Sequence, residues 1–405
     1  MHSFSHLSPA PALGGRPSEI GSEATTLSRL GITQLPTATL RQSGDLHLKF
    51  GVVALQGRVL NALCAQGWHA SAQGNMLCVA VSSLPKQSVV SPEAVFLPRN
   101  EAPRRDAVEL AALLSQVLPH GERGSVRALW VPQGQTPASV NLWDVEPLHD
   151  WITRQQNSWL LDVMRTHRLQ SVFQPIVSCS RPDEIFAYEC LLRGRTMGKG
   201  RPIAPSRILD AARGSGLLFQ VDFAARRTAI TGAARHRIHR NGAKIFINFT
   251  PMDTESSLQC LRSTLEIVDE LKLPRDSIVF EVIESEYIPD AALFGTVLDV
   301  YREEGFGVAL DDLGAGYASL NLLARLRPNY VKLDMELTRD VHRDNYKALI
   351  ARKLIETARE LDVKVVAEGI ECAEESEWLC EHGCDFAQGF YFAAPSSPPP
   401  ALLIH

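Results

Sequence analysis

The 405-residue sequence has no apolar run long enough to cross a membrane. Its longer apolar stretches, such as residues 76–81, fall far short of the roughly 20 residues that a bilayer requires, so no membrane span is expected. The N-terminus also lacks a basic segment followed by an apolar one. We therefore expect no secretory signal.

Positive charge is not in excess either. The chain has 41 Lys and Arg against 46 Asp and Glu, which gives a formal net charge of -5. Duplex DNA is bound through a basic face that neutralises phosphates, so this balance argues against duplex nucleic acid as the main partner. A local basic stretch, residues 193–207, is compatible with a small phosphate-bearing ligand.

The eight cysteines follow no regular spacing, so reduced thiols in a cytoplasmic protein are expected. One group, Cys380, His382 and Cys384, has the residue types of a zinc site. Zinc needs four ligands, and the fourth would have to be Cys372 or a more distant residue. We interpret these residues as structural cysteines instead.

The composition, with 45% hydrophobic and 21% charged residues, is that of a globular protein too long for a single core. Residues 1–45 are rich in Ser, Pro, Gly, Ala and Thr and are predicted to be a disordered tail. Residues 46–146 are predicted to form a small α/β domain, for which a regulatory role is expected. Its expected strands are 48–55, 76–81 and 126–131, and its expected helix is 106–117.

A connecting helix is predicted over residues 147–168. Pro147 suits a first helical turn, and an apolar stripe follows on one face, made of Leu148, Ile152, Trp159 and Val163. The stripe could be a signalling helix or dimer seam. Because it is not a sustained heptad repeat, we favour a helix that packs the stripe on the next domain.

Residues 169–396 alternate regularly between strand-like and helix-length segments, which predicts a (β/α)8 barrel of the TIM type. The eight strand-like runs are 171–177, 185–192, 244–248, 277–283, 307–310, 330–333, 364–367 and 385–389. Only residues 178–184 separate the first two runs, too few for a crossover helix. The fold class is therefore α/β, a modified barrel with one antiparallel strand, followed by a short tail at 397–405.

Polar residues stand at the ends of these strands, where a barrel gathers its reactive groups. In chain order they are Glu189, Asn248, Glu281 with Glu284, Asp311 with Asp312, Lys332, Glu368 with Glu371, and Gln388. Oxygen ligands without histidine or thiolate favour the hard cations Mg²⁺ or Mn²⁺. The doubled Asp311-Asp312 suits a site for two ions that act on a phosphoester.

Each of these acids alone could be a cap or a solvated loop residue, as Asp311 could be before the turn at Gly314. Their joint occurrence at successive strand ends favours the two-metal phosphoesterase. Lys332 would then neutralise developing charge or hold the attacking water.

Eight motifs, in order along the chain, resemble those of the EAL domain of cyclic di-GMP phosphodiesterases. They are Phe173-Gln174-Pro175-Ile176, Glu189-Cys190-Leu191-Leu192-Arg193, Asn248-Phe249-Thr250-Pro251, Phe280-Glu281-Val282-Ile283-Glu284-Ser285, Asp311-Asp312-Leu313-Gly314-Ala315-Gly316-Tyr317, Val331-Lys332-Leu333-Asp334, Ala367-Glu368-Gly369-Ile370-Glu371 and Gln388-Gly389-Phe390. The resemblance covers residues 169–395 approximately. It implies hydrolysis of cyclic di-GMP to the linear dinucleotide pGpG.

The resemblance also implies roles. The first metal ion is expected on Glu189, Asn248, Glu281 and Asp311. The second is expected on Asp311 and Asp312, with Glu368 as ligand or base and Lys332 beside the attacking water. Contacts to the dinucleotide are expected from Gln174, Leu191, Arg193, Asn248, Asp312 and Gln388. Glu284 would hold the loop after the fifth strand, and Glu371 would support substrate binding.

Three positions depart from the family pattern. Cys190 replaces the signature alanine, Thr250 replaces a serine, and Leu313 replaces a phenylalanine in the loop after the fifth strand. No motif of a cyclase that would make the messenger occurs. The alternative function is a receptor that binds cyclic di-GMP without cleaving it and signals through a protein partner. A homodimer is expected by resemblance.

Overall fold

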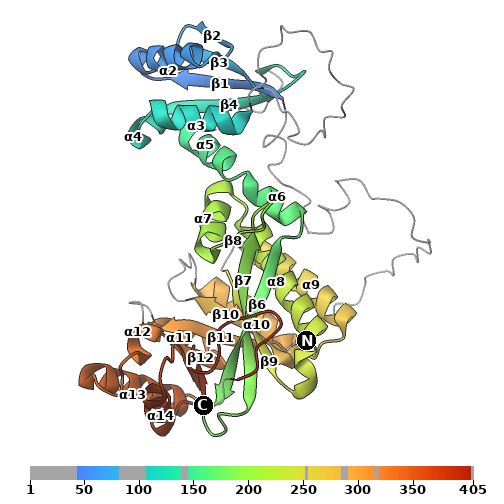
Figure 1. The fold of residues 1–405 in the computed structure, drawn as a ribbon, viewed down its shortest axis with the longest axis vertical. Coiled ribbons are helices and arrows are strands. Elements are labelled where there is room, and N and C mark those ends of the chain that lie inside the picture. The colour runs from blue at the N-terminus through green and yellow to red at the C-terminus, as the bar shows by residue number, and fades with distance from the viewer. Residues whose placement is uncertain are drawn as a thin grey trace, which may run out of the picture.

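The computed structural model describes residues 43–81, 106–137, 145–250, 254–283, 291–314 and 319–402. Two sheets form separate domains joined by short helices (Figure 1). Most of the expected disordered tail lies outside the described residues, but its last residues, Gly44 and Asp45, already belong to a strand. In the part of the chain described, no helix is both long and apolar enough to span a bilayer.

The N-terminal domain is a five-stranded antiparallel sheet in the order β2-β3-β1-β4-β5. Its elements are β1 (Gly44–Phe50), α2 (Val53–Ala65), β2 (Ala70–Gln73), β3 (Met76–Val81), α3 (Ala107–Val117), α4 (His120–Arg123), β4 (Val126–Pro132) and β5 (Glu146–Pro147). Alternate residues of β1, namely Leu46, Leu48 and Phe50, are buried in a core that the helices share.

The first expected strand, residues 48–55, is wrong at its end. The strand stops at Phe50, and α2 begins at Val53. The apolar residues after Val53 repeat every fourth position, with Leu55, Val59 and Leu63 buried, which is the spacing of one helix face.

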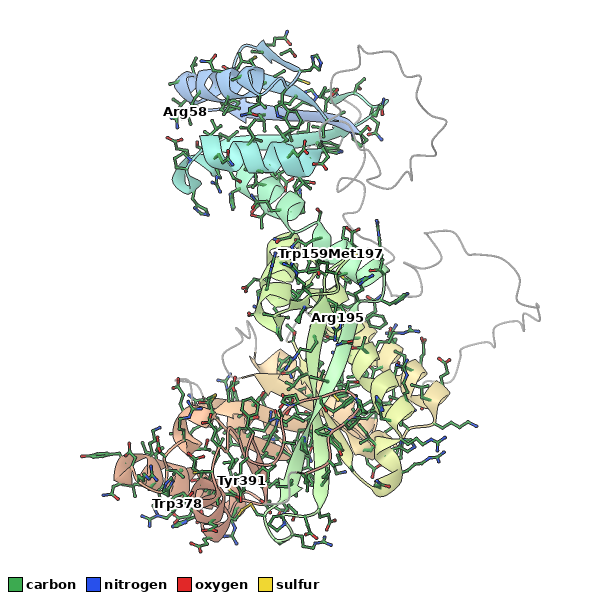
Figure 2. The ribbon with its side chains drawn as sticks, viewed as in Figure 1. Arg58, Trp159, Arg195, Met197, Trp378 and Tyr391 are labelled. Carbon is green, nitrogen blue, oxygen red and sulfur yellow. A yellow bond between two sulfur atoms is a disulfide. The ribbon has the colours of Figure 1, made fainter. Side chains whose placement is uncertain are left out.

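The single connecting helix expected over residues 147–168 is also wrong, because the structure has two helices. They are α5 (Leu148–Gln156) and α6 (Trp159–Arg165), separated at Asn157 and Ser158. The apolar residues of α5 pack in the N-terminal core, whereas those of α6 pack with α7 (Pro205–Ser215) of the second domain. Trp159 and Met197 mark this junction in Figure 2. The stripe therefore divides between two cores rather than forming one seam.

The second domain is a closed barrel of eight strands, with a short ninth strand, β8 (Pro202–Ile203), at the edge. The barrel strands are β6 (Leu169–Ser178), β7 (Ile185–Arg195), β9 (Lys244–Phe249), β10 (Ile278–Ile283), β11 (Gly307–Leu313), β12 (Tyr330–Leu333), β13 (Lys364–Ala367) and β14 (Phe386–Gln388). β6 runs antiparallel to both of its neighbours, and the other barrel pairs are parallel. The expected fold with one antiparallel strand is confirmed.

Helices surround this barrel (Figure 1). Besides α7 they are α8 (Leu218–His236), α9 (Thr254–Leu271), α10 (Ala291–Glu303), α11 (Ser319–Leu326), α12 (Met335–Thr338), α13 (Asn345–Glu360) and α14 (Ala373–Glu381), with 3-10 turns at η4 (Ile238–Asn241) and η5 (Arg275–Ser277). The helix-length segment 205–238 is split at Gly216, whose φ of 67° ends α7 in the left-handed conformation.

One pair of cysteines contradicts the expectation of reduced thiols. Cys179, just after β6, forms a disulfide with Cys380 of α14, 201 residues later in the chain. Their Cα atoms lie 5.3 Å apart, a proximity that sequence spacing could not reveal. Cys380 is thereby excluded as a zinc ligand, and Cys384 is a buried core residue as expected.

Candidate active site

The inward-facing side chains of the barrel form two layers. The lower layer is apolar and includes Ile176, Ala187, Phe246, Val279, Ala309 and Val366, with Tyr330 and Phe386 packed against it. Two positions further toward the carboxyl ends of the parallel strands, each strand has a polar residue instead. These residues are Glu189, Asn248, Glu281, Asp311, Lys332, Glu368 and Gln388, and on the antiparallel β6 the equivalent step reaches Gln174. The period-two alternation of eight strands thus creates one polar layer above an apolar plug.

Lys332 lies at the centre of this layer and is 1% exposed. Its Nζ is 2.6 Å from Glu368 Oε1, 2.8 Å from Glu281 Oε1, 3.1 Å from Asp311 Oδ1 and 3.7 Å from Glu189 Oε1. Burial lowers the pKa of Lys332, but the four carboxylates outweigh it and hold the pKa well above its usual range. The ammonium group is therefore firmly charged.

One lysine does not balance four carboxylates. Burial, with repulsion from Glu189 and Asp311, raises the pKa of Glu281 well above its usual range, although Lys332 opposes the shift. Burial likewise raises the pKa of Glu368, again opposed by Lys332. Glu281 is fully buried, and its Oε2 has no hydrogen-bond partner among the described residues. A buried carboxylate in this state is neutralised by a proton, as its raised pKa indicates, or by a further cation.

The second part of the layer depends on an irregularity in β11. Its pairing with β12 shifts register between Leu310 and Leu313, and Asp312 has a φ of 59°, in the left-handed region. Asp311, Asp312 and Glu368 each place a carboxylate oxygen within 4.8 Å of the others. Burial, followed by repulsion from Asp311, raises the pKa of Asp312 to about 6. The irregularity lets two consecutive acids face the same space.

Amide side chains close the other side of the layer. Gln388 Nε2 donates to Glu189 Oε2 at 2.5 Å and to Gln174 Oε1 at 3.1 Å. Gln174 Nε2 in turn donates to the backbone carbonyl of Ala393 at 3.2 Å. These bonds orient Glu189 and link β14 to β6 and β7, whose pairing closes the barrel.

The remaining predicted residues are placed less centrally. Asn248 is half-buried and pairs in register with Glu281 on the next strand. Leu191 and Arg193 alternate with Glu189 along β7 and are partly exposed, and Arg193 Nη1 donates to the Leu192 carbonyl at 2.8 Å. Glu371 is exposed and forms an ion pair with Arg339. Glu284 lies outside the described residues.

The donor set fits hard divalent cations. It combines carboxylates with the amide oxygen of Asn248, and it includes no histidine or thiolate among the described residues of the layer. Oxygen donors of this kind are those that Mg²⁺ and Mn²⁺ prefer. The excess of negative charge and the unsatisfied Glu281 oxygen agree with this assignment.

One ion pair that supports the site, between Arg226 and Asp222, was not predicted from the sequence. Arg226 Nη2 donates to Asp222 Oδ2 at 2.6 Å inside the protein, and Asp222 Oδ1 accepts from the backbone N–H of Thr250 at 3.1 Å. This pair fixes the end of β9, two residues after Asn248. The spacing of four residues on α8 was a visible signal, because it places opposite charges on one helix face.

Comparison with known proteins gives a consistent result. The family model for the EAL domain matches residues 157–395. NbdA of Pseudomonas aeruginosa, named a cyclic di-GMP phosphodiesterase, is 28% identical over 252 residues, which is 60% of this chain and 30% of that protein. PdeR of Escherichia coli, named in the same way, is 29% identical over 52% of this chain and 32% of its own. The chain thus spans about a third of the length of these relatives.

Two solved structures resemble the barrel domain. One is a standalone versatile EAL protein from Vibrio cholerae O395 in its c-di-GMP-bound form, with 32% identity and a TM-score of 0.51 over 58% of this chain and 95% of that one. The other is the PaMucR phosphodiesterase in complex with c-di-GMP, with 27% identity and a TM-score of 0.52 over the same shares.

Proposed function

The chain belongs to the EAL-domain family, and from that premise we propose that it hydrolyses cyclic di-GMP to linear pGpG with two divalent cations, Mg²⁺ or Mn²⁺. The observation that carries the proposal is the position of Lys332 among Glu189, Glu281, Asp311 and Glu368. Four carboxyl groups and a lysine in one buried layer would be too costly to retain for stability alone. The similarity to named phosphodiesterases supplies the substrate class.

In this proposal the strand-end oxygens hold the ions. Glu189, Asn248, Glu281 and Asp311 would bind the first, and Asp311 and Asp312 the second, with Glu368 nearby. When bound, the ions would stabilise charge on the attacking and leaving oxygens of the phosphoryl displacement. The reaction adds water across one phosphodiester bond: the water oxygen joins phosphorus, and the 3′ oxygen leaves with a proton.

The protein's own groups would place that water. Lys332 Nζ can donate a hydrogen bond to it and offset negative charge as the transition state forms. Glu368 Oε, 2.6 Å from Lys332, would accept the proton that the water loses. Asp312 lies within 4.8 Å of the same carboxylate and would complete this side of the site.

The amides and β7 would bind the dinucleotide. Gln174 and Gln388 already share a hydrogen bond beside Glu189, and Leu191 with Arg193 extends the same strand outward. Arg193 would pair with a phosphate through its planar fork. Glu371 would support substrate binding from the loop after β13, where Arg339 holds it, and Glu284 would hold the loop after β11.

We further propose that the N-terminal domain, residues 46–146, regulates the barrel and that the protein acts as a cytoplasmic homodimer. Regulation is supported by the connection between the domains, in which α5 packs in the N-terminal core and α6 packs with α7 of the second domain. The homodimer and the location rest on the resemblance to the family.

The test is incubation of the purified protein with cyclic di-GMP and Mg²⁺ or Mn²⁺, with the products separated by chromatography. Formation of pGpG that is lost in Glu189→Ala is expected. Intact cyclic di-GMP that remains bound to the wild-type protein would instead identify a receptor without activity.

A further inference from the structure

A second group of metal-ligating side chains lies outside the polar layer, on the segments that follow β12 and β13. His342, Cys372 and Glu375 each place a ligand atom within 4.8 Å of the others. His342 lies between α12 and α13, Cys372 is the N-cap residue of α14, and Glu375 is in its first turn. In Figure 2, Trp378 marks α14, at the end of the barrel domain far from the N-terminal sheet.

His342 is unsatisfied in this position. Both of its ring nitrogens are shielded from solvent, and neither has a hydrogen-bond partner in the described part of the chain. An unsatisfied buried polar atom costs roughly 1–3 kcal/mol, so a buried imidazole normally has a partner. A metal ion would accept the lone pair of one ring nitrogen and remove the cost for that nitrogen.

Negative charge at the cluster comes from Glu374 and Glu375. Glu375 is 3% exposed, and its oxygens accept from the backbone N–H of Asp340 at 2.8 Å and of Glu371 at 2.9 Å. These bonds orient the carboxylate, which still has lone pairs for a metal. Glu374 directly precedes Glu375 in the same first turn of α14.

We propose that His342, Cys372 and Glu375, with Glu374 as a fourth donor, form a binding site for a transition-metal ion of the Zn²⁺ or Co²⁺ class. Mixed nitrogen, sulfur and oxygen donors favour such ions over Mg²⁺ and Mn²⁺. Metal–ligand bonds of roughly 2.0–2.3 Å place the donor atoms roughly 3.3–3.8 Å apart. The donor atoms, now within 4.8 Å of one another, would therefore move closer together by about 1 Å on binding. The Cys372 thiol loses its proton to solvent, because the thiolate is the ligand.

The ion would join two segments that already meet near the active site. Arg339, three residues before His342, pairs with Glu371, which directly precedes Cys372. The backbone of Glu371 and of Asp340 is held by the same Glu375 carboxylate. Binding would therefore stabilise the loops after β12 and β13 without using any residue of the oxygen-donor layer.

The experiment is a Co²⁺ titration of the 405-residue protein in excess Mg²⁺, with its free thiols reduced and the Cys179–Cys380 disulfide intact, read by the near-ultraviolet absorption that a cobalt–thiolate bond produces. Oxygen ligands give no such band, so the polar layer does not contribute to the signal. We expect the band to saturate at one equivalent in the wild type. Cys372→Ser should abolish it, and His342→Gln should weaken Co²⁺ binding by at least about tenfold.

The matched control is Cys78→Ser. Cys78 belongs to another group of possible ligands, with Asp45 and His47 on the N-terminal sheet, and this variant should keep the full band. Thermal melting of each variant confirms folding. The proposal is overturned if the wild type gives no thiolate band, if the band survives Cys372→Ser, or if it disappears in Cys78→Ser.

Discussion

In both sheets of this protein, inward and outward side chains alternate along the strands, but the inward side chains differ in kind. Along β1 every inward side chain is apolar, and Leu46, Leu48 and Phe50 are buried in the core. Along β10 the inward side chain changes from Val279 to the fully buried Glu281 within two residues. The first arrangement stabilises a domain, whereas the second keeps charges in a place where they lower stability. The polar layer therefore serves chemistry rather than folding.

The largest effect should follow from removing one charge of the polar layer. Glu281→Gln is expected to lower the rate of cyclic di-GMP hydrolysis at least ~1000-fold, about 4 kcal/mol of barrier. It should not lower the free energy of unfolding of the metal-free protein, because a buried neutral amide is less costly than a buried carboxylate. Steady-state rates and urea unfolding check both parts. The exposed Glu303→Gln is the matched control, and a large loss of stability in Glu281→Gln would contradict the comparison.

Lys332→Met removes the positive charge of the same layer. It leaves Glu189, Glu281, Asp311 and Glu368 without their shared cation. Loss of one partner of a buried ionic group costs about 3–5 kcal/mol, which urea unfolding in EDTA measures. Added Mn²⁺ should restore part of the loss. Unchanged stability without metal would show that the carboxylates are not charged.

In the N-terminal sheet, unlike at Glu281, substitution of an inward side chain should lower the free energy of unfolding. Leu48→Ala should destabilise the N-terminal domain by about 3 kcal/mol, because it leaves a cavity in the core. Lys49→Ala, on the opposite face of the same strand, should change stability by less than about 0.5 kcal/mol. Denaturant unfolding followed by circular dichroism separates the two. Equal effects would mean that the faces of β1 are assigned incorrectly.

The smallest effect concerns pH. The pKa of Asp312 is raised to about 6 in the folded protein, so the folded state holds this proton more tightly than the unfolded state. Between about pH 4 and pH 6 the metal-free protein should therefore lose stability as the pH rises. Asp312 is partly exposed, so solvent reduces its share to less than about 1 kcal/mol. Unfolding of Asp312→Asn at both pH values should show a smaller decline, and an equal decline would rule out this contribution.

The barrel could be predicted from the sequence because each of its strands is marked by residues that are neighbours in the chain. Strands such as β12 and β13 are delimited by their own apolar runs, and the polar residue at each end, such as Lys332 or Glu368, can be read directly from the chain. The resemblance to a family then supplied roles that periodicity does not contain.

Features that join distant parts of the chain could not be predicted in this way. The disulfide between Cys179 and Cys380 and the group of His342 with Cys372 depend on the packing of separate βα units. The shift in β11 that turns Asp312 toward Asp311 depends on pairing with a neighbouring strand. The division of the connecting helix reflects two cores, each of which buries its own apolar residues.

In the proposed function, acids from separate strands hold two hard cations. The most direct measurement is anomalous X-ray scattering from crystals of the protein grown with Mn²⁺. Two manganese peaks are predicted, one between Glu189, Glu281 and Asp311, and the other beside Asp312. An absence of manganese among these carboxylates at saturating Mn²⁺ would contradict the account.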